Sequence, residues 1–300
     1  MDSPKLIRKT TNRVFFWILV YHLIMVIVNL ILSPYSLPEG TDMLISVLVG
    51  VAVVYLVNRK HISKDVFVER KKMTAKDFFV LFGCISITQL ITAVIVKAAE
   101  SSGAQGVSFD ISKTTFTMLL YSGLVGPLCE ELIFRGFVCG SYRKYGAALA
   151  IVLSAIAFGL VHANLEQFLA AGLAGLVLAF VCTEYSILWA LAYHVINNFL
   201  FSDLPYLIFG QGASKTIDAV EYSIFGIFAI YAVYALIKRR GEISAYFSRE
   251  DVPAQKGAVK EILKSFWLWV FLVIYVGIMV LMMVFPEQIS QITAAAAAGA

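Results

Sequence analysis

Hydrophobic and polar positions follow one another along this chain in long blocks. Nine uncharged, mainly apolar runs are separated by shorter polar segments. A helix rises about 1.5 Å per residue and the hydrocarbon core of a bilayer is about 30 Å thick, so about 20 apolar residues are enough to cross it. The pattern predicts an all-α, polytopic transmembrane bundle of about 8–9 helices. The runs are residues 14–38, 43–58, 78–96, 114–129, 145–165, 167–183, 185–202, 222–237 and 265–286.

Composition supports the membrane class. The 300 residues are 60% hydrophobic and 15% charged, whereas a soluble domain is about half apolar and a quarter charged. Lys5, Arg8, Lys9 and Arg13 precede the first run, as in a signal peptide. That run is too long for a signal peptide and no small-residue cleavage site follows it. We therefore expect it to be retained as the first helix.

The basic residues predict the topology, because cytoplasmic loops are rich in Lys and Arg. Of the 24 Lys and Arg residues, 20 fall in the N-terminus, 58–76, 143–144 and 238–264. Nine crossings place all four segments on one side, with only Lys97, Lys113 and Lys215 on the other. We therefore expect a cytoplasmic N-terminus and an external C-terminus, most simply in a bacterial plasma membrane.

The polar segments divide the chain into parts. Residues 1–111 hold the first helices and a basic segment, and 112–203 form a core of apolar helices. Residues 204–240 add a further helix, and 204–214 are apolar but too short to span, which suggests an interfacial or re-entrant piece. Residues 241–293 comprise a polar cytoplasmic segment and an additional C-terminal helix. Residues 294–300 are an Ala-rich tail.

The stretch "EELIFR" (130–135) places two glutamates and an arginine inside an apolar region. On a helix, Glu131 and Arg135 lie one turn apart in the favourable order for an ion pair. Glu130 lies about 100° around the helix and has no such partner. A second carboxylate leaves the cluster net negative at low dielectric, which favours a functional role for Glu130. Glu131 and Arg135 are expected to be mainly structural.

Two later runs carry titratable residues at helical spacing. "FGLVH" places Phe158 and His162 four residues apart, and "HVINN" does the same for His194 and Asn198. Counted from the nearest cytoplasmic end, Glu130, His162, His194 and Asn198 lie about 15 to 27 Å deep. They can therefore meet near the middle of the membrane. His22 lacks polar neighbours and is expected to be structural.

Such a group of residues meets the needs of hydrolysis. A glutamate can act as general base toward water with a histidine assisting. A histidine and an asparagine can donate hydrogen bonds to an oxyanion.

The three motifs, EExxxR, FxxxH and HxxxN in this order on separate spans, resemble the CPBP family. That family includes CAAX-processing endopeptidases and bacteriocin-processing or immunity proteins. The resemblance covers about residues 112–203. It implies an all-α intramembrane peptidase with a water-filled cavity open toward the cytoplasm.

The resemblance also implies a role for each matched residue. Glu130 and His162 activate water, and His194 with Asn198 binds the oxyanion. Glu131 and Arg135 support the site, and Phe158 packs beside it. The ninth run and the external C-terminus exceed the usual family core, so residues 241–300 are open to a separate role.

Two alternatives remain open at this point. Glu130, His162 and His194 are a legitimate zinc set, although HExxH is absent and Asn198 suits an oxyanion better than a metal. A non-catalytic immunity or scaffold protein could keep the cluster for partner binding. We expect the partners to be membrane lipid and a protein or peptide substrate. We expect neither a cofactor nor nucleic acid.

Overall fold

The computed structural model describes residues 4–62, 64–101, 115–210 and 213–285, and these form helices and loops without a strand. The first part contains α1 (Pro4–Leu32), α2 (Thr41–Asn58), the short 3₁₀ turn η1 (Lys64–Phe67) and α3 (Ala75–Ser101). The all-α prediction is confirmed. Between α2 and α3, the basic segment contains little helix beyond η1.

The central part begins with one continuous helical run, Phe116–Tyr145, that changes its winding several times. It is followed by α7 (Ala147–Leu160) and α8 (Leu165–Glu184). The segments of the continuous run are α4 (Phe116–Leu120), η2 (Tyr121–Val125), α5 (Gly126–Glu130), η3 (Glu131–Cys139), α6 (Gly140–Tyr142) and η4 (Arg143–Tyr145).

The remaining part starts with a second continuous run over residues 187–209, made of α9 (Ile187–Val195), η5 (Ile196–Asp203) and α10 (Leu204–Phe209). Residues 204–209, part of the stretch for which the sequence suggests an interfacial or re-entrant piece, continue the preceding helix. The chain then forms α11 (Ser214–Lys238), α12 (Arg240–Phe247), α13 (Ala258–Leu263) and α14 (Phe266–Val284). The predicted Ala-rich tail, 294–300, lies outside the described residues.

Seven helices among the described residues are long and apolar enough to span a membrane, and the chain is an integral membrane protein. They are α1, α2, α3, the Phe116–Tyr145 run, α8, α11 and α14. The two other predicted crossings correspond to α7, which is apolar but has only 14 residues, and to the 187–209 run, whose winding changes at Ile196.

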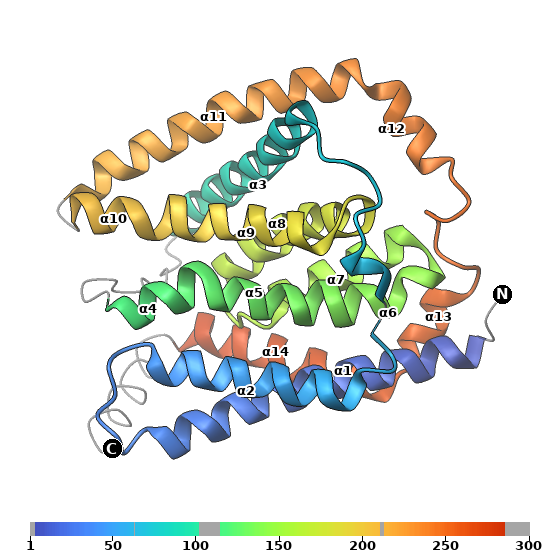
Figure 1. The fold of residues 1–300 in the computed structure, drawn as a ribbon, viewed down its shortest axis with the longest axis horizontal. Coiled ribbons are helices and arrows are strands. Elements are labelled where there is room, and N and C mark those ends of the chain that lie inside the picture. Colours follow the sequence, from blue (N-terminus) through green and yellow to red (C-terminus); the bar gives the residue numbers. More distant parts are fainter. Residues whose placement is uncertain (1–3, 63, 102–114, 211–212, 286–300) are drawn as a thin grey trace.

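The bundle has two flanks around a central group. Figure 1 shows α3 and α11 along one side and α1 with α2 along the other. The Phe116–Tyr145 run, α7, α8 and α9 lie between them and contact one another. On the second flank, α14 packs on α1, with the rings of Phe15 and Phe271 4.9 Å apart. The central group holds the polar residues that the sequence singles out.

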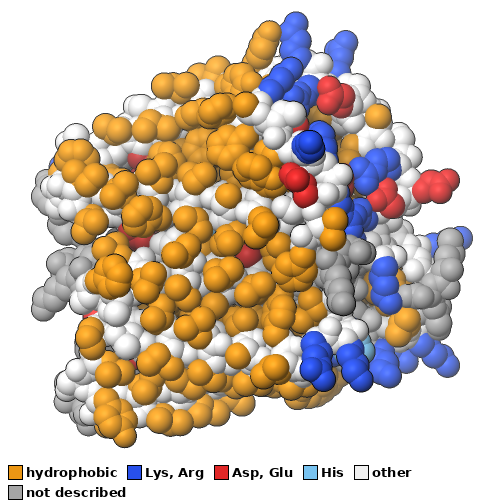
Figure 2. Space-filling model, in the orientation of Figure 1, with side chains coloured by type: hydrophobic (Ala, Val, Ile, Leu, Met, Phe, Trp, Pro, Cys, Tyr) orange, Lys and Arg blue, Asp and Glu red, His pale blue; other side chains and the backbone are white. Residues whose placement is uncertain are grey.

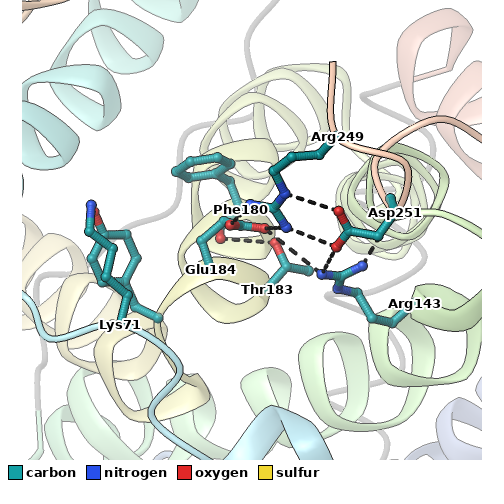
Figure 3. Close-up of polar contacts among 8 residues, drawn as sticks. Lys71, Arg143, Phe180, Thr183, Glu184, Arg249 and Asp251 are labelled. Atoms are coloured by element: carbon teal, nitrogen blue, oxygen red, sulfur yellow. Dashed lines mark hydrogen bonds and ion pairs between the residues drawn. The ribbon is translucent and has the colours of Figure 1, made fainter. Parts of the chain in front are cut away.

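Charge is segregated to one end of the molecule. Figure 2 shows Lys and Arg side chains gathered at one end and hydrophobic side chains over most of the remaining visible face. Ion pairs join the basic segments there: Arg239 contacts Asp77, and Arg143 contacts Asp251 at 2.9 Å. Arg143, Glu184, Arg249 and Asp251 form one network (Figure 3). The predicted grouping of 58–76, 143–144 and 238–264 on one side is confirmed.

Candidate functional site

A cavity of about 320 Å³ lies between the central group and the flank formed by α3 and α11, and we call it the site cavity. The structure brings four predicted site residues and their aromatic neighbour together in its wall, as their depths predict. They are Glu130, Phe158, His162, His194 and Asn198. His22 is not among the lining residues; its Nδ1 bonds the carbonyl of Ile18. No residue of 241–285 lines the cavity either; α14 packs on α1 and also contacts α7.

Behind the cavity wall, Glu131 and Arg135 form a buried ion pair. The Nε of Arg135 lies 3.2 Å from the Oε2 of Glu131, and the two side chains are 0% and 1% exposed. The guanidinium also lies 4.4 Å from the centre of the Phe158 ring, and its Nη2 donates to the carbonyl of Gly175 at 3.4 Å. An arginine can reside here because a carboxylate, a carbonyl and an aromatic face replace its hydration.

The segment that carries this pair is a π-helix. The amide of Gly140 donates to the carbonyl of Arg135, five residues earlier. The wider winding leaves carbonyls for side chains from neighbouring helices: the Tyr55 hydroxyl donates to the carbonyl of Leu132, and Ser154 donates to that of Phe134. A Cβ at Gly136 would overlap the Tyr55 hydroxyl. Such π-segments are frequent at functional sites, and another one, η5, carries Asn198.

His194 links the buried ion pair to the cavity. Its Nδ1 lies 2.9 Å from the Oε1 of Glu131, and its Nε2 lies 3.5 Å from the Oε2 of Glu130. An ionised carboxylate only accepts, so Nδ1 of His194 donates to Glu131. That hydrogen bond fixes which nitrogen faces the cavity. We expected Glu131 to be taken up by Arg135 alone; instead its two oxygens divide between Arg135 and His194.

The two adjacent glutamates occupy different surroundings. Glu131 is 1% exposed, with one oxygen hydrogen-bonded to His194 and the other in an ion pair with Arg135, whereas Glu130 is 26% exposed and lines the cavity. A carboxylate with access to water and a carboxylate locked in an ion pair serve different purposes. The difference in environment matches the difference in role predicted from helical phase.

The FxxxH spacing predicted that His162 lies on a helix. The residue instead enters the cavity from the turn that follows α7. Helix α7 ends at Leu160, because Ala163 adopts a left-handed backbone with φ 53°. Nδ1 of His162 lies 2.8 Å from the carbonyl of Phe158 and donates to it. Nε2 of the ring is therefore the nitrogen left outside this contact. Asn164 caps the next helix, α8, and so ends the turn.

Amide side chains form a chain of hydrogen bonds along another part of the cavity. Gln89 of α3 donates to Asn197 at 3.0 Å, and Asn197 donates to the Oδ1 of Asn198 at 3.2 Å. The Nδ2 of Asn198 donates to the carbonyl of Ser122 at 3.4 Å. An amide nitrogen has two hydrogens, so Asn198 keeps a second donor for another acceptor.

Sequence reasoning missed several polar residues near the site. Glu221 of α11 and Gln167 of α8 line the cavity. Asp203, 9% exposed, accepts a hydrogen bond from Ser122 at 2.8 Å. Glu221 and Asp203 lie at the ends of apolar runs, where a charge is expected from the bilayer boundary. The packing of α11 and η5 against the core brings Glu221 to the cavity wall and Asp203 to Ser122.

The described residues hold no group of three or more His, Cys, Asp or Glu side chains placed to share a metal ion. Glu130 and His194 are close to each other, and Nδ1 of His162 bonds the carbonyl of Phe158, which leaves its Nε2 outside that contact. A zinc site would need Glu130, His162 and His194 to converge on one ion, and the expectation of no cofactor stays a prediction.

Comparison with known proteins points to the same segment. Residues 112–200 match the family model for Type II CAAX prenyl endopeptidase Rce1-like. "Putative membrane peptidase YdiL" of Bacillus subtilis (strain 168) is 32% identical over 104 residues, 34% of this chain and 42% of that protein. "UPF0177 protein YxdF" of Lactococcus lactis subsp. lactis (strain IL1403) is 29% identical over 159 residues, 49% of this chain and 83% of that protein. No solved structure matches the chain significantly.

The family match spans all three motifs, so the resemblance to the CPBP family is confirmed for that segment. The aligned part is less than half of the Bacillus protein.

Proposed function

We propose that this membrane protein is an endopeptidase that hydrolyses a peptide bond of a membrane-associated or lipidated protein or peptide. The proposal rests on the match of residues 112–200 to a CAAX prenyl endopeptidase family. The observation that carries it is a pair of neighbouring carboxylates with opposite environments: Glu131 is locked to Arg135 and His194, while Glu130 faces the cavity. A base must reach both a water and the substrate, and Glu130 alone of the two can do so.

In the proposed reaction, Glu130 accepts a proton from a water molecule that attacks the peptide carbonyl. His162 assists through its Nε2, because Nδ1 is already committed to the carbonyl of Phe158. The proton passes to the leaving amine as the carbon–nitrogen bond breaks. Atoms balance: water is split between the new carboxyl group and the new amine.

The oxyanion of the tetrahedral intermediate is assigned to His194 and Asn198. The second Nδ2 hydrogen of Asn198 serves as one donor. His194 donates from Nε2 only when its ring carries both protons, and Glu130 and Glu131 lie 3.5 and 2.9 Å from that ring. When His194 is protonated, its positive charge and that of Arg135 balance the negative charges of Glu130 and Glu131. Donors already aimed at the developing charge stabilise it without reorganisation.

The basic end is proposed to face the cytoplasm in a bacterial plasma membrane, following the Lys and Arg distribution. A substrate would then reach the cavity from the membrane or from that side. Prenylation is named only in the description of the matched family, so the lipid on the substrate is part of the proposal.

The direct test is cleavage by the full chain, reconstituted in bilayer discs, of membrane-anchored peptides with and without a C-terminal prenyl group. Mass spectrometry identifies the bond that is cut, and Glu130→Gln serves as the inactive control. Site-specific cleavage by the wild type alone supports the proposal. Absence of cleavage across a broad peptide library, together with tight binding of one peptide, would favour the non-catalytic alternative.

A further inference from the structure

We infer that the protein binds a phosphate-bearing anion in a second pocket, separate from the site cavity. This basic pocket has a volume of about 990 Å³ and shares no lining residue with the site cavity. Its wall comes from α1, from the turn after α2, from residues 140–146 and from the loop at 250–255. Six Lys and Arg side chains line it: Lys9, Arg13, Lys60, Arg70, Arg143 and Lys144.

The acidic residues of the basic pocket do not balance this charge. Among the described residues that line it, Asp251 and Glu250 are the only carboxylates. Asp251 is engaged by Arg143 and Arg249 at 2.9 and 2.8 Å (Figure 3). The hydrogen bonds from Arg249 and Arg143 lower the pKa of Asp251 well below its usual range, so it stays ionised and committed to them. Among the described residues, Lys9, Arg13 and Lys60 have no ion pair. The pocket therefore keeps a positive excess.

Three residues that line the basic pocket carry buried donors without partners. Ser141 is 5% exposed, and its hydroxyl is buried without a hydrogen-bond partner. The Nε atoms of Arg13 and Arg143 are buried and unpartnered as well. A buried donor left unsatisfied costs about 1–3 kcal/mol. A ligand with several acceptor oxygens, bound with a small rearrangement of these side chains, would supply the missing partners.

The chemistry of the wall selects phosphate. Guanidinium groups and ammonium groups are the usual partners of phosphate oxygens, and a serine hydroxyl can donate beside them. The general preference for Lys and Arg on the cytoplasmic side explains exposed basic residues. It does not explain a concave pocket with buried, unpartnered donors. Basic pockets between helices near that surface are known to bind anionic lipid headgroups, and a soluble phosphate compound offers the same oxygens.

The test uses the full chain in a neutral detergent and follows its melting temperature. Three probes are added: short-chain phosphatidylglycerol, phosphatidylcholine of the same chain length, and inorganic phosphate. We expect the melting temperature to rise saturably with phosphatidylglycerol or with inorganic phosphate, and to rise less with phosphatidylcholine. A response to phosphatidylglycerol alone assigns the ligand to a lipid headgroup, and a response to inorganic phosphate at low concentration assigns it to a soluble anion.

Variants connect the response to the pocket. In Lys9→Gln/Lys60→Gln the half-saturating concentration should rise about tenfold or more, since each basic contact near the surface is worth about 1 kcal/mol. The control Lys72→Gln/Arg240→Gln removes the same charge from exposed positions outside the pocket and should respond like the wild type. Ser141→Ala should weaken the response while leaving the ligand-free melting temperature unchanged or higher, because it removes an unsatisfied buried hydroxyl.

If Lys9→Gln/Lys60→Gln and its control weaken the melting response to the same extent, the inference is overturned, because the effect then comes from general surface charge. An equal response to phosphatidylcholine and phosphatidylglycerol, without any response to inorganic phosphate, would overturn it too. Both double variants change exposed side chains, so misfolding does not obscure the comparison.

Discussion

The imidazole of His194 lies 2.9 Å from the carboxylate of Glu131, so a residue four positions before Arg135 is shared between that arginine and a histidine of another span. The contact joins the buried ion pair to the cavity wall. A change at Glu131 therefore affects both the folding of the core and the orientation of His194, whereas a change at Glu130 affects the cavity alone.

Glu130→Gln should abolish cleavage while leaving the protein folded. Glutamine has nearly the same shape but cannot accept the proton of water, and loss of a general base costs about 10²–10⁴-fold or more. Glu130 is 26% exposed and its ion-pair contact, with His194, is 3.5 Å long, so the melting temperature should stay close to that of the wild type. Activity and thermal unfolding are measured on the same preparation. Cleavage at the wild-type rate would rule out the role assigned to Glu130.

Glu131→Gln should destabilise the protein, by about 3–5 kcal/mol if Arg135 is left as an uncompensated buried charge. Glu130→Gln is the matched control, because it makes the same chemical change one residue away at a more exposed position. Thermal unfolding in detergent compares the two. If both variants melt together, Phe158 and the carbonyl of Gly175 would suffice to hold Arg135, contrary to the role given to Glu131.

Much of the architecture follows from the sequence. Blocks of uncharged residues indicate where helices lie, because the bilayer imposes length and apolarity on each span. The depths of Glu130, His162, His194 and Asn198, counted from the cytoplasmic ends of their helices, predicted that the four lie in one layer. These inferences need only a fixed rise per residue.

Features that depend on packing were not predictable in this way. The π-segments at 131–139 and 196–203 depend on neighbouring helices, since Tyr55 and Ser154 bond carbonyls of the first one. The end of α7 before His162 depends on the unusual φ of Ala163. Glu221 reaches the cavity because α11 packs on α3. No periodicity in one segment shows which faces of distant segments meet.

Asn198→Ala should lower kcat about 10²–10³-fold with little change in KM, as expected for loss of one oxyanion donor. Asn197→Ala is the comparison. Asn197 contacts Asn198 through its side chain and orients it, so its loss should be smaller. Steady-state kinetics on the cleaved peptide separate the two. Equal losses in kcat would mean that Asn198 acts only as part of the amide chain from Gln89.

Cysteine labelling should place the basic end on the cytoplasmic side. Single cysteines at Lys72 and Arg240 should react with a membrane-impermeant maleimide only after cells are opened, and one at Lys215 should react in intact cells. The physical reason is the positive-inside bias of Lys and Arg. Cys129, Cys139 and Cys182 are buried, so Cys84 is the one native thiol to replace first. Labelling of Lys72→Cys and Arg240→Cys from outside would invert the proposed topology.

Exhaustive chelation should leave the activity intact. Without a metal, Glu130 serves as base with His162, and His194 with Asn198 forms the oxyanion site, which gives each polar residue one task. A zinc site would instead require Glu130, His162 and His194 to converge, with carboxylates or carbonyls fixing the histidine tautomers. The contact from Nδ1 of His194 to Glu131 is of that kind. Elemental analysis of purified active protein is the direct measurement. Stoichiometric zinc, with activity lost on its removal and restored on its return, would make the two histidines ligands and replace the glutamate mechanism.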